Sequence, residues 1–195
     1  MLFRSTIPNC VAYDPCYGYE LAVILQDGMR RMLQEKEDVF YYVTVMNENY
    51  AHPPMPAGAE EGIRKGMYLL RPGRGSGEKV TLLGSGTILR EALAAAEVLE
   101  KEHGRPAEVW SVTSFSELRR DPAWVERSLA GARLTVAATD YVKAVPEMIR
   151  GWVPGRYVTL GTDGFGRSDT RAALRAWFGV DRDSIVRAAL ESGPR

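Results

Sequence analysis

Glu48 and His52 are the two residues of this sequence whose types and spacing could carry acid–base chemistry. Both follow segment 39–45, whose β-branched and aromatic residues predict a buried strand. Sites form in loops at the carboxyl ends of strands in open α/β sheets, and a carboxylate beside an imidazole can transfer protons. The alternative is a solvated loop with a capping glutamate and a surface histidine, and the residue types alone favour this simpler interpretation.

Two glycine-rich segments could bind a ligand through a helix N-terminus. The first, Gly84-Ser85-Gly86, is predicted to join a strand to a helix, but Leu89 stands where a dinucleotide fingerprint requires glycine or alanine. No Lys-Ser or Lys-Thr pair follows, as a P-loop would need. This segment is therefore predicted to be a helix-capping turn, without nucleotide binding.

The second glycine-rich segment runs from Leu160 to Thr170. It predicts a strand that ends at Leu160, then a tight turn, then a helix that begins near Ser168 or Asp169, both good N-caps. The turn contains the three glycines Gly161, Gly164 and Gly166. Such a turn could meet a ligand or a neighbouring subunit, yet its spacing alone favours a plain connection.

The remaining chemically active side chains give little sign of a site. Cys16, at a predicted helix start, is expected to be buried in packing, with a reactive thiol as the alternative. Cys10 and Cys16 are the two cysteines of the sequence, and so low a number favours reduced thiols in a cytoplasmic protein. His52 and His103 lie far apart in sequence. We therefore predict no metal site and no cofactor-binding residues in this chain.

The composition is that of a globular protein. The chain has 195 residues, 45% of them hydrophobic, with 25 basic and 25 acidic side chains. Since no block of five like charges occurs, nucleic-acid binding through a basic face is not expected. No apolar run approaches the ~20 residues of a membrane span, and the first residues do not form a signal peptide. A cytoplasmic protein without membrane contact is expected.

The first part of the chain holds few elements. Segment 7–12 is predicted to be a strand end, Asp14-Pro15 to cap a helix over 16–34, and 39–45 to be a strand. In the region 52–66, three prolines exclude regular structure and Gly58 and Gly62 loosen the chain, which predicts a linker. Residues 1–52 are too few to bury a core of their own, so they either pack on the rest or belong to an incomplete domain.

The second part, residues 66–195, alternates strands and helices. Strands are predicted at 66–70, 79–83, 108–112, 134–138 and 157–160. Helices are predicted at 86–102, 122–130, 146–152, 169–178 and 182–192. This alternation predicts an α/β fold with a mostly parallel or mixed five-stranded sheet and helices on both faces. Four aromatic residues are expected in its core: Trp110, Trp152, Trp177 and Phe178.

Several motifs, in this order, resemble one enzyme family, the homodimeric thiamine-diphosphate-dependent pyruvate dehydrogenase of the pyruvate dehydrogenase complex. They are Thr6-Ile-Pro-Asn-Cys10, Tyr13-Asp-Pro15, Met46-Asn-Glu-Asn-Tyr50, Met55-Pro56, Glu60-Glu-Gly-Ile-Arg-Lys-Gly66, Leu83-Gly-Ser-Gly-Thr-Ile-Leu-Arg90, Ser111-Val-Thr-Ser-Phe115, Glu117-Leu118, Arg120-Asp121 and Leu160 to Thr170. The resemblance covers nearly the whole chain. It corresponds to the end of the pyrimidine-binding middle domain (1–52), a linker (53–65) and the transketolase-like C-terminal domain (66–195).

The resemblance implies a role for Glu48, because the Asn-Glu-Asn-Tyr loop of the family borders the active site at the dimer interface. His52 is the companion candidate. In the family, thiamine diphosphate and Mg²⁺ are held by an N-terminal domain, and a glutamate earlier in the middle domain activates the cofactor. This sequence lacks those regions and any Gly-Asp-Gly segment followed by the expected asparagine. Its segment 121–134 is also shorter than in relatives, which affects contacts made there.

The resemblance predicts a C-terminal fragment or subunit of pyruvate dehydrogenase with a structural, dimerising role, inactive alone. The complete enzyme would decarboxylate pyruvate oxidatively and transfer the acetyl group to a lipoyl group. Expected partners are the missing N-terminal region, a second copy of the chain and the lipoyl acyltransferase component. The alternative is a free-standing regulatory module that binds an anion or another small molecule at the helix N-termini near Gly86 and Ser168.

Overall fold

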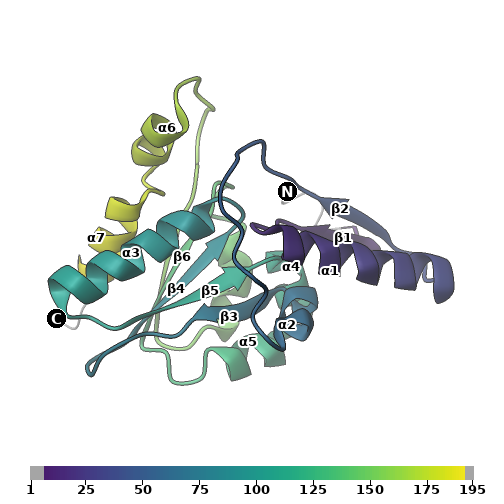
Figure 1. Ribbon diagram of the computed structural model, residues 1–195, viewed down its shortest axis with the longest axis horizontal. Coiled ribbons are helices and arrows are strands. Elements are labelled where there is room, and N and C mark those ends of the chain that lie inside the picture. Colours follow the sequence, from purple (N-terminus) through teal and green to yellow (C-terminus); the bar gives the residue numbers. More distant parts are fainter. Residues whose placement is uncertain (1–6, 192–195) are drawn as a thin grey trace.

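The larger of two β-sheets forms the centre of the molecule. In a computed structural model that describes residues 7–191, its strands are β3 (Met67–Arg71), β4 (Val80–Ser85), β5 (Ala107–Val112), β6 (Leu134–Ala138) and β7 (Arg156–Leu160). The strands lie in the order β3-β5-β4-β6-β7 (Figure 1). Four are parallel and β3 is antiparallel to β5. The predicted mixed five-stranded sheet is therefore confirmed.

Helices cover both faces of this sheet, as predicted. Helices α3 (Ile88–His103) and α7 (Arg182–Glu191) pack on one face, where Leu82 is buried. On the other face, Leu83 is buried among α4 (Phe115–Arg120), α5 (Pro122–Ser128) and the 3₁₀ helix η3 (Pro146–Trp152). Neighbouring leucines of β4 reach opposite layers because side chains alternate along a strand. Within residues 7–191, none of the helices has the length and apolar character needed to cross a membrane.

The N-terminal part adds a small second sheet beside the large one (Figure 1). Strand β1 (Cys10–Tyr13) pairs in parallel with β2 (Phe40–Val43), and α1 (Gly18–Met29) with the π-helical turn η2 (Arg30–Gln34) connects them. Ile24 of α1 is fully buried in a cluster with Ile63 and Tyr68 from the following segment. Residues 7–52 thus pack on the rest of the molecule, while the domain division itself stays a prediction.

The prediction that 52–66 lacks regular structure is wrong, because residues Ala59–Lys65 form helix α2. The prolines end at Pro56, before the helix begins, and therefore do not disturb it. Gly58 and Gly66 flank the helix with positive φ angles of 75° and 102°. Glycine adopts such angles at no steric cost, so Gly58 and Gly66 mark the start and the end of the helix.

Helix α4 was not predicted, although Ser114 caps it by accepting a hydrogen bond from the Glu117 amide at 3.1 Å. Helix α6 (Arg171–Phe178) begins later than predicted, since Thr170 and neither Ser168 nor Asp169 is its N-cap. The structure also corrects the prediction for Trp177, whose exposed fraction is 66%. Residue 192 of the predicted last helix and Thr6 of the first motif lie outside the described residues.

Candidate functional site

Polar residues gather where the parallel strands of the large sheet end. Thr87 follows β4, Asp140 follows β6 and Thr162 follows β7. Asp14, which follows β1, reaches the same edge, because its carbonyl accepts a hydrogen bond from the Gly86 amide at 3.1 Å. This is the edge at which ligands bind in open α/β sheets. We therefore treat it as the candidate site.

Glu48 lies at this edge within the irregular segment 44–58 and is held by basic side chains. Its Oε1 accepts a hydrogen bond from Arg90 of α3 at 2.8 Å, and its Oε2 accepts one from Arg175 of α6 at 3.0 Å. The Thr87 hydroxyl donates to the same carboxylate at 3.2 Å. Burial alone would raise the pKa of Glu48, but hydrogen bonds and charges from Arg175 and Arg90 hold it below its usual range.

These contacts make Glu48 an ionised anchor between two helices. Arg175 also donates to Glu91 at 3.1 Å and to the Thr87 hydroxyl at 2.8 Å, so its guanidinium is held in one position. Arg171 donates to the carbonyl of Asn47 at 2.6 Å. Because a carboxylate with a lowered pKa is a poor proton donor at neutral pH, Glu48 is better suited to positioning than to acid–base transfer.

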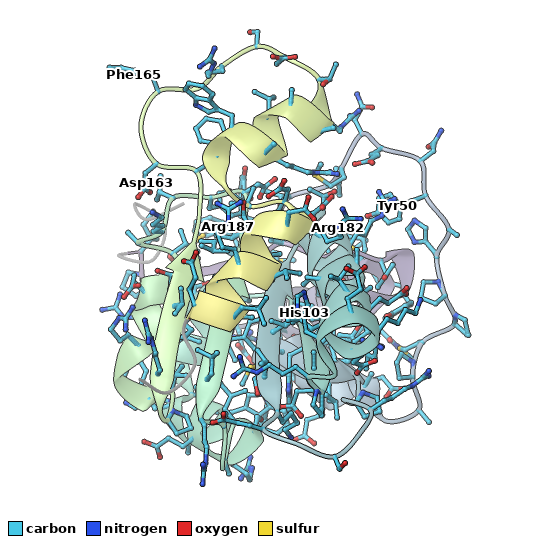
Figure 2. The ribbon with its side chains drawn as sticks, turned by 90° about the vertical axis from the view of Figure 1, so that its left-hand side faces the viewer. Tyr50, His103, Asp163, Phe165, Arg182 and Arg187 are labelled. Atoms are coloured by element: carbon cyan, nitrogen blue, oxygen red, sulfur yellow. The ribbon has the colours of Figure 1, made fainter. Side chains whose placement is uncertain are left out.

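His52 meets different partners. Its Nδ1 accepts a hydrogen bond from the Gly18 amide at the start of α1, at 2.8 Å. Its ring stacks on the Tyr50 ring with centroids 4.9 Å apart. The Arg90 guanidinium lies over the same Tyr50 ring, 4.5 Å from its centroid. Figure 2 shows Tyr50 on the irregular segment that passes beside α3. The structure thus directs His52 to the N-terminus of α1 and Glu48 to α3 and α6.

Asp14 is a buried acid that the sequence interpretation assigned to a helix cap. Helix α1 instead begins at Gly18, and Asp14 is 7% exposed. Its Oδ1 accepts a hydrogen bond from the Thr44 hydroxyl at 2.6 Å, whereas its Oδ2 has no partner within residues 7–191. Burial, helped by the charge of Asp140, raises the pKa of Asp14 to about 7.

The Gly84-Ser85-Gly86 segment forms a turn, and Asp14 lies against it. A Cβ at Gly86 would be 2.6 Å from the Asp14 Oδ2, so a carboxyl group occupies the space that a bound phosphate would need. Cys16 is buried as predicted, and burial raises the pKa of its thiol to about 12. A thiol with so high a pKa is a weak nucleophile at neutral pH.

Glu20 is a further buried acid, which the sequence analysis did not single out. It is fully buried and accepts hydrogen bonds from the amides of Cys16 and Tyr17 at 2.6 and 2.9 Å. The hydroxyls of Tyr68 and Ser111 donate to its other oxygen at 2.8 and 2.6 Å. Burial raises the pKa of Glu20 while these hydrogen bonds oppose the rise. One side chain therefore caps α1 and attaches it to β3 and β5.

The titratable side chains of the described residues do not assemble a metal site. Within residues 7–191, no three or more His, Cys, Asp or Glu side chains are grouped so that they could hold a metal ion. The Glu48 carboxylate is instead bound by Arg90, Arg175 and the Thr87 hydroxyl. The contacts of Glu48 and Asn47 with arginines can hold the segment 44–52 against α3 and α6 and orient those arginines.

Two family models match consecutive parts of the chain. Residues 1–53 match the pyruvate dehydrogenase E1 component middle domain, and residues 66–181 match the transketolase-like TK C-terminal domain. The chain is 54% identical to the pyruvate dehydrogenase E1 component of Pseudomonas aeruginosa, over 98% of this chain and 24% of that protein. It is 52% identical to the same component of Escherichia coli K12, over 95% of this chain and 23% of that protein.

Solved transketolases share the fold. The enzyme from Leishmania mexicana superposes with a TM-score of 0.74 at 19% identity, covering 97% of this chain and 26% of that one. The transketolase from Campylobacter jejuni gives a TM-score of 0.72 at 21% identity, covering 98% of this chain and 27% of that one. The chain spans about a quarter of the length of the curated relatives it matches. It belongs to the family of transketolase-like C-terminal domains, and its sequence relatives are pyruvate dehydrogenase E1 components.

Proposed function

We propose that this chain supplies the C-terminal domain and the adjoining end of the middle domain of a pyruvate dehydrogenase E1 enzyme. The observation that carries the proposal is the match of two consecutive parts of the chain to those two domains. The contacts of Glu20 support it, because they attach the middle-domain helix α1 to the C-terminal sheet. The role of the chain is then to hold this region of the enzyme together.

The complete enzyme would act in the cytoplasm, decarboxylating pyruvate oxidatively and passing the acetyl group to a lipoyl group of the acyltransferase component. Thiamine diphosphate with Mg²⁺ would supply the carbanion chemistry of that reaction. The described residues do not fit the metal part of this cofactor, since they contain no suitable ligand cluster. We therefore place the cofactor on another part of the homodimeric enzyme and derive no catalytic step from this chain.

Within that enzyme, Glu48 and His52 would border the active site. The anchoring of Glu48 by Arg90 and Arg175 supports a positioning role for the loop 44–52. His52 would act through the same loop, with its ring held against Tyr50. The alternative of a regulatory module at helix N-termini loses one of its two supports, because Ser168 does not cap α6.

Complementation tests the proposal. The Pseudomonas aeruginosa relative would be shortened by the region that matches this chain and mixed with the purified chain. We expect pyruvate-dependent acetyl transfer only when both polypeptides are present, and thiamine diphosphate binding by calorimetry only when the shortened relative is present. Micromolar cofactor binding by this chain alone, or failure of the two polypeptides to associate, would overturn the proposal. In the reconstituted enzyme, His52→Ala should lower turnover, whereas the control His103→Ala, at an exposed position of α3, should not.

A further inference from the structure

A cavity of about 270 Å³ opens between the glycine-rich loop 161–170, helix α6 and the start of α3. Gly164 and Gly166 line it from the loop, and Thr87 lines it from the turn before α3. Figure 2 shows this loop as an arch, with Phe165 on its outer bend and pointing away from the molecule. Neither Glu48 nor His52 lines the cavity, whereas Thr87 and Arg175, which both contact Glu48, do.

Three arginines, each four residues from the next, reach this cavity: Arg167, Arg171 and Arg175. Arg175 is neutralised by Glu48 and Glu91. Arg167 has no carboxylate partner within residues 7–191; its guanidinium lies 3.8 Å from the ring centroid of Trp177. Stacking on an aromatic ring holds a guanidinium in place while its edge stays free for hydrogen bonds.

Arg171 also has N–H groups that are free to donate further hydrogen bonds. One of its amino groups donates to the Asn47 carbonyl, and its Nε is 3.8 Å from a Glu48 oxygen that Arg175 already binds at 3.0 Å. The cavity therefore presents two guanidinium groups: Arg167, without a carboxylate partner among the described residues, and Arg171, whose one carboxylate contact is the 3.8 Å approach to Glu48. Arginine binds phosphate and carboxylate oxygens through pairs of parallel hydrogen bonds.

The rest of the lining is mostly apolar, with the polar Thr162 and one acidic residue. Leu174 and Phe178 of α6 and Ile88 of α3 offer a surface for a ring or an aliphatic body. Asp140 also lines the cavity; desolvation raises its pKa, while a backbone hydrogen bond and the charge of Arg175 oppose that rise. Small-molecule sites combine such a mostly apolar wall with a few convergent polar groups.

We propose that this cavity binds a small phosphomonoester, with the phosphate between Arg167 and Arg171 and the apolar body against Leu174 and Phe178. A phosphate dianion balances two guanidinium charges, whereas a carboxylate balances one. The inference rests on the cavity and its arginines and does not depend on the proposed enzymatic role. Failure of phosphate binding would therefore leave the complementation result untouched.

Phenyl phosphate is a suitable probe because it joins a phosphate to a flat apolar ring. Titrated into the full chain by calorimetry, it should bind with a Kd of ~0.1–1 mM. Benzoate, phenol and inorganic phosphate should each bind at least ~10-fold more weakly. Benzoate and phenol lack the phosphate group, and inorganic phosphate lacks the apolar ring. Arg167→Gln and Arg171→Gln should each weaken phenyl phosphate binding by ~10-fold or more.

Arg127→Gln provides the matched control, because Arg127 also lies over a tryptophan, 5.1 Å from the Trp124 ring, and does not line the cavity. It should bind phenyl phosphate as the unchanged chain does. Thermal unfolding of all three variants checks that they remain folded. Absence of binding at 10 mM (roughly ten times the weakest Kd expected), benzoate binding as tightly as phenyl phosphate, or equal losses in Arg127→Gln and Arg167→Gln would each overturn the proposal.

Discussion

Asp14 is the residue whose buried, half-satisfied carboxyl has a direct consequence for stability. Its pKa is raised from 3.8 to about 7 in the folded chain, because burial disfavours the charged form. A raised folded pKa means that the folded state holds the proton more tightly than the unfolded state. This contribution to stability is therefore full below about pH 4 and is lost as the pH rises through about 7.

Asp14→Asn should remove this loss. We expect the advantage of the variant over the original chain in free energy of unfolding to be about 1–3 kcal/mol larger at pH 8 than at pH 5. Urea unfolding at the two pH values measures the difference. Asp38→Asn, at an exposed carboxyl, serves as the control. A pH-independent effect of Asp14→Asn would show that the buried carboxyl does not titrate in this range.

Glu48→Gln tests whether Glu48 has a positioning role in the assembled enzyme. The substitution removes the charge that holds Arg90 and Arg175, and with it the fixed position of the loop. We expect turnover to fall by ~100-fold, with a much smaller change in thermal stability. Glu126→Gln, at an exposed site on α5, is the control. Unchanged turnover would make Glu48 a bystander of the reaction.

At the scale of elements, the turn from β4 to α3 depends on Gly86. Its φ of +49° and its closeness to Asp14 both disfavour a side chain. Gly104, at the end of α3, has a similar φ of +59° but no atom within 4 Å of an added Cβ. Comparing alanine at the two positions therefore separates the clash from the backbone strain.

We expect Gly104→Ala to cost about 1 kcal/mol, the usual penalty for a side chain at positive φ. Gly86→Ala should cost at least ~2 kcal/mol more, since the junction between β1 and β4 must shift to admit the methyl group. Chemical unfolding at pH 7 measures both values. Equal costs would mean that the Asp14 side chain moves aside freely and does not constrain the turn.

At the scale of the whole molecule, the N-terminal part leaves apolar side chains uncovered. Leu33, Met29 and Leu25 are 70%, 55% and 49% exposed along α1 and η2, and Phe40 of β2 is 45% exposed. Figure 1 shows α1 at the end of the molecule away from α7, with the small sheet beside it. Exposed apolar surface of this kind favours association with a second surface.

We expect the purified chain to self-associate through this face, as measured by light scattering over a range of concentrations. Leu33→Glu should shift the chain toward the monomer, because association would bury the added charge. Phe165→Glu introduces the same charge at a side chain 97% exposed in the glycine-rich loop and should change nothing. A monomeric original chain, or equal effects of the two variants, would contradict the assignment of this face.

The sequence by itself determined the regular elements of the large sheet. Apolar strands such as 134–138 and the amphipathic pattern at 86–102 are local signals, so their positions follow from neighbouring residues alone. The alternation of these elements was enough to predict helices on both faces. Motif similarity predicted a transketolase-like C-terminal domain, which the family-model match confirms. These features depend on short stretches of chain and do not require knowledge of long-range contacts.

Only the tertiary structure decided how the acids are used. Glu48 meets Arg175, 127 positions away, and Glu20 meets Ser111, 91 positions away, and no local pattern encodes such distances. The short helix α2 likewise depends on Ile63 being fully buried by packing. Burial and charge neighbours set a pKa, and both arise only when distant segments meet. The chemistry of Asp14 and Glu48 therefore belongs to the folded molecule, although their positions are plain in the sequence.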